Sequence, residues 1–404
     1  MALNSWQFLL FASAAVLIVP IFTGGARAVV FLAFNAVFIW SYWGPESLPY
    51  AVGYGLTGYL AARLVQGRGT VVLVASVALL SIAFVYMRGY QLGGQADAGG
   101  PGTANALAFV GLSFLFFKMI HVVVDSWSGT LGHLSIRHYA NYCLSFTTVL
   151  MGPIERYQDF VAQSDGQAPR TFEVNLDGVN RVLRGLLKAF VLAPFVAPYA
   201  LKHGLPIETL EGGDLLLRTY AFYAFLYLDF SGYCDIVIGI ASLMGHRLPE
   251  NFNFPFLSRN VSEYWLRVHR SLTLWLTDYI FTPTYRWALG SGGLGAHGFL
   301  ALAGSLMLTM IVAGVWHGTT LNFAAFGLVH GAALVAVRGY EHIMVAQLGR
   351  ARLRRFEERP GVKIAAIFLT YNFTSLAYVF FALDLDEGIR VLERLATTVG
   401  GLRS

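Results

Sequence analysis

The stretch 299–316, FLALAGSLMLTMIVAGVW, contains no charged residue and leads directly into His317. After a glycine and two threonines, a second apolar run follows at 321–337 and carries His330. A membrane-spanning helix needs about 20 mostly apolar residues, so both runs predict spanning helices. An ionisable side chain in or near a bilayer is costly and usually marks a pathway or a reaction centre. From the pattern alone, His317 is a catalyst, a proton relay or a packing residue.

The composition extends this interpretation to the whole chain. Of its 404 residues, 56% are hydrophobic and only 13% are charged, and the mean hydropathy is +0.58. Soluble domains carry about 25% charged residues. We therefore predict an all-α polytopic membrane protein with about ten to eleven transmembrane or re-entrant helices. The candidate spans are 8–22, 29–42, 50–65, 71–86, 104–124, 139–151, 185–201, 215–244, 261–281, 299–316, 321–337 and 362–383.

The positive charge of the chain predicts its orientation. The net charge is +5, and the densest basic loop, 341–363, is rich in arginine. Because Lys and Arg are retained on the cytoplasmic side, we expect this loop in the cytoplasm and a multi-pass protein in the cell (inner, cytoplasmic) membrane. Arg181, Arg184 and Lys188 are interpreted as an anchor at the membrane interface. The first residues, Met1–Trp6, contain no basic residue, so no cleaved signal is expected.

Two carboxylates lie inside the apolar run 226–235, LYLDFSGYCD. Asp229 and Asp235 are six residues apart, which places them on different faces of a continuous helix. Gly232 between them offers a point where the helix could be interrupted. Two interpretations stay open: the carboxylates line a polar cavity, or they pair with a cation and fix helix packing.

The segment that follows mixes a loop with a helical pattern. Residues 248–258, LPENFNFPFLS, contain two prolines and predict a loop. Asn260 and Glu263 then suit a helix N-terminus, and we expect an amphipathic helix over 261–281. Its apolar stripe consists of Trp265, Val268, Leu272, Trp275 and Tyr279. His269 adjoins the stripe, a position at which a packing histidine is commoner than a catalytic one.

Several longer motifs occur in a fixed order between residues 151 and 382. They are MGPIERYQDF (151–160), YLDFSGYCDIVIG (227–239), MGHRLPENFNFPFLSRNVSEYWLRVHRSLTLWLTDYI (244–280), GVWHG (314–318), FAAFGLVHG (323–331) and VFFA (379–382). Together they resemble the membrane-bound O-acyltransferase family, in the bacterial branch of alginate O-acetyltransferases and teichoic acid D-alanyl transfer proteins. The resemblance implies a ring of tilted helices around a central tunnel, which admits the acyl donor from the cytoplasm and the acceptor from outside.

The resemblance also implies a division of the chain and roles for its residues. It implies one membrane-embedded acyltransferase domain over 1–404, with N-terminal helices at 1–103, a family core at 104–383 and a short C-terminal segment at 384–404. His317, in the Trp-His-Gly motif, corresponds to the family's catalytic histidine. His269 corresponds to a second functional histidine.

The expected chemistry is transfer of an acyl group from a thioester to a hydroxyl. A neutral imidazole in a poorly solvated tunnel suits a general base, and His317 is the candidate. His269 would orient the acceptor, share the proton or polarise the thioester carbonyl. Candidate donors to the tetrahedral oxygen are Trp316, Asn322, Tyr264 and Arg267. These four, with His330 and Asp229, are also the candidates for substrate binding. No metal, flavin or nucleotide motif is present, so we expect no bound cofactor, only an acyl thioester co-substrate, acetyl-CoA or an acyl carrier protein.

Four functions therefore compete at this stage. The first is transfer of an acyl group, acetyl by preference, from a cytoplasmic thioester to an exported polysaccharide, as in alginate biosynthesis. The alternative is D-alanyl or other acyl transfer to teichoic acid or a cell-wall polymer, which the short C-terminal segment also suits. From another class, a proton-coupled transporter would use the aspartates with His317 and His330 as a relay, and a scaffold in an envelope complex is a further option. Expected partners are the bilayer, the acyl donor, a glycan or envelope acceptor and a periplasmic or extracellular acyltransferase partner, with no nucleic acid.

Overall fold

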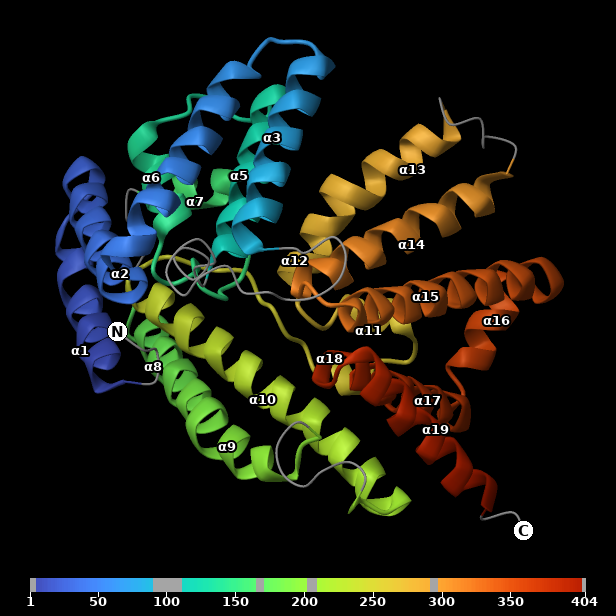
Figure 1. Cartoon of the computed structure of the whole chain (residues 1–404). Coiled ribbons are helices and arrows are strands. Elements are labelled where there is room, and N and C mark those ends of the chain that lie inside the picture. Colours follow the sequence, from blue (N-terminus) through green and yellow to red (C-terminus); the bar gives the residue numbers. More distant parts are fainter. Residues whose placement is uncertain (1–4, 90–110, 165–170, 202–208, 291–296, 402–404) are drawn as a thin grey trace. The chain divides into compact units, whose positions relative to one another are not determined.

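The computed structural model describes residues 5–89, 111–164, 171–201, 209–290 and 297–401, and all regular structure within these ranges is helical (Figure 1). Seven of the described helical segments are long and apolar enough to cross a membrane. They are α2 (Gly24–Leu64), α3 (Thr70–Arg88), the segment Phe172–Tyr199, α10 (Gly212–Leu243), α14 (Gly298–His317), α15 (Leu321–Leu348) and the segment Pro360–Ala382. The prediction of an all-α polytopic membrane protein is confirmed. The ring of ten to eleven helices around a tunnel stays a prediction.

The chain forms two compact units. The first consists of residues 1–187 and 232–249, and the second of residues 188–231 and 250–404. Helix α10 contributes its first twenty residues, 212–231, to the second unit and its end to the first. The candidate active-site histidines all belong to the second unit.

The first unit contains α2 and α3 with several shorter helices. These are α1 (Trp6–Ile18), η1 (Val19–Ile21), α5 (Leu112–Trp127), α6 (Ile136–Leu144), α7 (Tyr157–Gln163) and α8 (Phe172–Leu187). Helix α2 is kinked at Gly44, whose φ of 73° suits glycine, and Pro45 follows at once. The kink falls between the two spans predicted at 29–42 and 50–65. Because part of the predicted span 104–124 lies outside the described residues, only its end, within α5, is observed.

Helix α8 packs against the end of α10 through glycines and an ion pair between Arg181 and Asp235. A Cβ added at Gly185 would lie 2.6 Å from the Gly232 carbonyl oxygen, so the two backbones are in contact there. Nearby, Arg181 Nε lies 3.1 Å from Asp235 Oδ1. Helix α10 continues through Gly232, so the helix is not interrupted at this possible break point. For Asp235 the structure supports the interpretation as a helix-packing residue, and Arg181 is its partner.

The second unit contains the remaining helices. They are η2 (Lys188–Leu192), α9 (Ala193–Val196), η3 (Ala197–Tyr199), η5 (Pro255–Leu257), α11 (Val261–Trp265), α12 (Arg270–Leu276), the π-helical turn η6 (Thr277–Phe281), α13 (Thr282–Leu289), α14, α15, α16 (Arg350–Glu357), α17 (Pro360–Ala377), α18 (Val379–Ala382) and α19 (Leu385–Gly401). The loop at 248–258 holds only the short turn η5, and Asn260 caps α11 by accepting from the Glu263 amide at 2.8 Å. The prediction of one helix over 261–281 is wrong, because the chain leaves helical geometry at His269.

Helices α14 and α15 form an antiparallel pair whose backbones touch (Figure 1). A Cβ added at Gly314 would lie 2.2 Å from the Phe323 carbonyl oxygen, and one at Gly327 would lie 2.3 Å from the Met310 carbonyl oxygen. No side chain fits at that distance, so glycine is required at both positions. Small residues allow helices in a membrane to approach closely and gain van der Waals contact. This contact determines where the end of α14, with His317, lies against α15.

We predict that Gly314→Ala destabilises the protein by about 1–3 kcal/mol, since the methyl group forces the two helices apart. The matched control is Gly304→Ala on the same helix, where an added Cβ meets no atom within 4 Å. Thermal unfolding of the detergent-solubilised chain should show a lower melting temperature for Gly314→Ala alone. Equal melting temperatures for the two variants would contradict the close helix contact.

Candidate active site

His317 lies at the C-terminal end of α14, where the backbone turns toward α15. Its ring is half-buried among aromatic side chains. The ring centroid lies 4.5 Å from that of Trp316, 5.0 Å from that of Phe381 in α18 and 6.1 Å from that of Phe326 in α15. The imidazole is therefore held by packing from three helices while part of its surface stays accessible.

His269 lies between α11 and α12 and is 6% exposed. Its ring centroid is 4.9 Å from that of Phe230 in α10 and 6.1 Å from that of Trp316. Trp316 thus contacts both His269 and His317, which are 48 positions apart in the sequence. The structure brings the two predicted histidines to one tryptophan.

Asn251 explains why the helix breaks at His269. The side chain of Asn251 is fully buried, and its Oδ1 accepts hydrogen bonds from the Ser271 amide (3.2 Å) and hydroxyl (2.7 Å). Its backbone carbonyl accepts from the Arg270 amide at 3.0 Å. These bonds satisfy the first amides of α12 and leave His269 in the left-handed region, with φ 42° and ψ 47°. Such a conformation costs a non-glycine residue about 1–3 kcal/mol, which the surrounding hydrogen bonds must offset.

The surroundings of the two histidines suggest different tasks. His269 lies outside the seven spanning segments, and burial lowers the pKa of its imidazole to about 3. At neutral pH this ring is uncharged and a weak proton acceptor, but it can still donate or accept a hydrogen bond. His317 is less buried, and part of its surface stays exposed. The two imidazoles therefore differ in burial, although Trp316 contacts both.

Arg267, Asn322 and Tyr264, three of the predicted oxyanion donors, form hydrogen bonds within the protein. The guanidinium of Arg267 contacts Glu263 at 2.7 Å, and Asn322 Nδ2 donates to the Phe380 carbonyl at 2.9 Å. Tyr264 shares a hydrogen bond of 2.8 Å with the Tyr378 hydroxyl. Burial alone would raise the pKa of Glu263, but hydrogen bonds from the Arg259 amide and the Arg267 guanidinium outweigh it, and the pKa is lowered. The fourth predicted donor, Trp316, is the one that contacts both histidines.

His330 and Asp229 differ in burial: His330 is fully buried, whereas Asp229 is exposed. His330 is fully buried in α15, and its ring centroid lies 4.5 Å from that of Phe326, 5.4 Å from that of Trp265 and 6.1 Å from that of Tyr264. The ring of Phe326 packs on both His330 and His317. Asp229 is exposed on α10, next to Phe230, which packs on His269.

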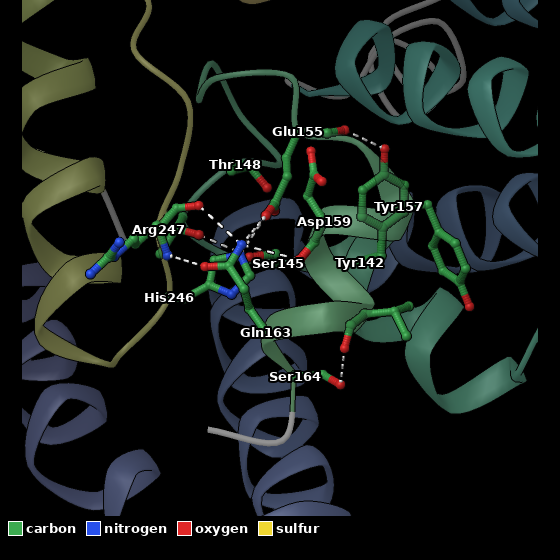
Figure 2. Close-up of polar contacts among 12 residues, drawn as sticks. Tyr142, Ser145, Thr148, Glu155, Tyr157, Asp159, Gln163, Ser164, His246 and Arg247 are labelled. Atoms are coloured by element: carbon green, nitrogen blue, oxygen red, sulfur yellow. Dashed lines mark hydrogen bonds and ion pairs between the residues drawn. The ribbon is translucent and has the colours of Figure 1, made fainter. Parts of the chain in front are cut away.

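The first unit contains a polar cluster that the sequence analysis did not assign (Figure 2). His246 Nε2 lies 2.7 Å from Glu155 Oε1, and Gln163 Oε1 accepts from the Arg247 amide at 2.7 Å. The Tyr142 hydroxyl donates to the Glu155 carbonyl at 2.7 Å. Glu155 and His246 stand in the motifs at 151–160 and 244–280, and the cluster ties these two segments together. Because both motifs belong to the ordered set, their presence in one chain was the only sequence signal of this contact. The two residues are 91 positions apart, so no local pattern could pair them.

Comparison with known proteins identifies the family of the chain. The sequence profile of the membrane-bound O-acyltransferase family matches residues 68–381. The chain belongs to the membrane-bound O-acyltransferase family. This confirms the predicted family and, at the level of the family, the prediction of an O-acyltransferase that uses an acyl donor as co-substrate.

Its curated relatives fall in the predicted branch. The chain is 27% identical to the teichoic acid D-alanyltransferase of Bacillus subtilis (strain 168) over 332 residues, 81% of each chain. It is 33% identical to the probable alginate O-acetylase of Azotobacter vinelandii over 230 residues, 57% of this chain and 44% of the relative. It is 32% identical to the peptidoglycan O-acetyltransferase of Helicobacter pylori (strain ATCC 700392 / 26695) over 267 residues, 64% of this chain and 47% of the relative. The matched regions thus cover less than half of the latter two relatives.

We predict that Asn251→Ala destabilises the site locally by about 1–3 kcal/mol, because the buried donors of Ser271 lose their acceptor. Hydrogen–deuterium exchange should become faster at the amides of the first turn of α12. Asn253→Ala is the matched control, since the exposed Asn253 holds Arg267 through its backbone amide, which alanine retains. Unchanged exchange in Asn251→Ala would contradict the role of Asn251.

Proposed function

We propose that the chain transfers an acyl group, acetyl by preference, from a thioester to a hydroxyl of an exported cell-surface polysaccharide. The observation that supports this most is the contact of Trp316 with both His317 and His269 in a membrane-bound O-acyltransferase. The donor would be acetyl-CoA or an acyl carrier protein on the cytoplasmic side of the cell membrane. The acceptor would be presented from outside, with the help of a periplasmic or extracellular partner.

In this mechanism His317 acts as the general base. Its imidazole takes the proton of the acceptor hydroxyl while the oxygen attacks the thioester carbonyl. The tetrahedral intermediate then expels the thiolate as the carbon–sulfur bond breaks, and the imidazolium returns the proton to sulfur. The products are an ester on the acceptor and a free thiol, and His317 is neutral again. No electron transfer is involved, so the reaction needs no redox cofactor.

The other residues would position the reactants. His269, buried and neutral, orients the acceptor hydroxyl or polarises the thioester carbonyl by a hydrogen bond. Trp316 keeps the two imidazoles at a set separation and brings an indole N–H to the site, a donor type suited to a developing oxyanion. The aromatic rings of Phe326 and Phe381 exclude water from one side of His317 and protect the thioester from hydrolysis.

D-alanyl transfer to teichoic acid is the second candidate, and one observation favours it. The match to the teichoic acid D-alanyltransferase covers 81% of both chains, whereas the match to the probable alginate O-acetylase covers 44% of that relative. The two candidates use the same histidines and the same acyl transfer. They differ in the acyl group and in the acceptor.

We predict that His317→Ala lowers ester formation by about 10²–10⁴-fold, the usual contribution of a general base. The measurement is the alkali-labile ester content of the cell-surface polymer in a strain that carries the variant as its sole copy. The exposed His133 supplies the matched control, His133→Ala, and membrane fractions should contain both variants in equal amount. Wild-type ester content in the His317→Ala strain would refute the proposed base.

The identity of the acyl group separates the two candidates. Mild alkali applied to the purified polymer should release acetate, in an amount that depends on His317. Chromatography of the released acids measures it. Release of D-alanine in place of acetate would exclude the first candidate and establish the second.

A further inference from the structure

A cavity in the second unit lies outside the aromatic cluster around His317. It has a volume of about 1020 Å³ and is lined by Tyr285 of α13, the start of α14, the second half of α15, and α16. The ends of two spanning helices therefore form one part of its wall, and the short basic helix α16 forms another. None of the residues to which the catalytic proposal assigns a role lines it.

The wall contributed by α14 and α15 is largely apolar. Phe299, Leu300 and Leu302 line it from α14, and Val345 lines it from α15. Leu300 keeps 58% of its surface exposed, and the Phe299 ring packs 6.0 Å from the ring of His342. This apolar wall is continuous with the apolar surface of spanning helix α14.

The wall contributed by α16 is cationic. Arg350, Leu353, Arg354 and Glu357 line the cavity at the i, i+3, i+4 and i+7 positions of one helix face. Leu353 is buried and secures the helix, while Arg350 and Arg354 are exposed. On α15, Arg338 is paired with Glu341 at 2.8 Å, so this pair adds little net charge. Three arginines against two glutamates give the lining a net positive charge.

The geometry points to a binding site for one anionic phospholipid, with its phosphate on Arg350 and Arg354 and its acyl chains along Phe299 and Leu300. A guanidinium presents paired N–H donors that match phosphate oxygens, and two of them one turn apart suit a single phosphodiester. A soluble phosphate would bind the arginines but would make no contact with the apolar wall, whereas the acyl chains of a lipid would be buried against it. The site is independent of acyl transfer, because no residue of the catalytic proposal contributes to it.

The test uses the full-length chain in detergent and titrates it with dioleoylphosphatidylglycerol, followed by native mass spectrometry. One molecule should bind, and phosphatidylcholine should bind far more weakly. Each arginine near a lipid phosphate contributes about fivefold in affinity, so the double variant Arg350→Gln with Arg354→Gln should bind phosphatidylglycerol about 25-fold more weakly. The matched control is Arg352→Gln with Arg355→Gln, which removes the same charge from the other face of α16 and should bind normally.

Several outcomes would overturn the proposal. They are equal losses in the two double variants, equal affinity for phosphatidylcholine, or displacement of the lipid by an equimolar amount of inorganic phosphate, which would identify a soluble-phosphate site instead. If the first double variant fails to fold, the wild-type chain is titrated at 50 mM and 500 mM salt. Binding of phosphatidylglycerol should then weaken markedly with salt, and salt-independent binding would refute the role of the arginines.

Discussion

The contact between α14 and α15 at Gly314 and Gly327 is the constraint on which the candidate site depends. Because the two backbones touch, the end of α14 is placed beside the first turns of α15, and His317 meets Phe326. Phe326 in turn packs on His330, and Asn322 of the same helix holds the Phe380 carbonyl, at the start of α18. A wider helix separation would leave His317 without its aromatic surroundings. The positions of the site residues therefore follow from two residues that have no side chain.

A second constraint acts on the other histidine and is polar. Asn251 supplies hydrogen-bond acceptors to Arg270 and Ser271, and this offsets the cost of the left-handed backbone at His269. The break turns the His269 ring toward Phe230 and Trp316. In a continuous helix the His269 ring would lie on the same face as Trp265, four residues before it, and Leu272, three residues after it. Local strain at one residue is thus the means by which two distant histidines reach the same tryptophan.

Much of this architecture could be predicted from the sequence. The apolar runs at 299–316 and 321–337 correspond to α14 and α15, and Asn260 caps α11 as expected. The prediction of one helix over 261–281 was wrong because the apolar residues keep a helical spacing through the break. The residue that stabilises the break, Asn251, lies 20 positions before its partner Ser271. The same limit applies to Asp235, whose partner Arg181 is 54 positions away. The spacing of apolar residues can be read locally and predicts helices. Pairs of buried polar residues form only when the fold brings distant positions together, so local spacing does not predict them.

We propose that acyl transfer takes place at His317, beside Trp316 and His269. The most direct measurement is an experimental structure of the full chain, by electron cryomicroscopy, with a non-hydrolysable analogue of the acyl thioester. We expect the analogue's carbonyl carbon to lie about 4–6 Å from the nearer nitrogen of the His317 imidazole, which leaves room for the acceptor oxygen between them, and its oxygen to face Trp316 or His269. An analogue bound with its carbonyl remote from His317 would contradict the account.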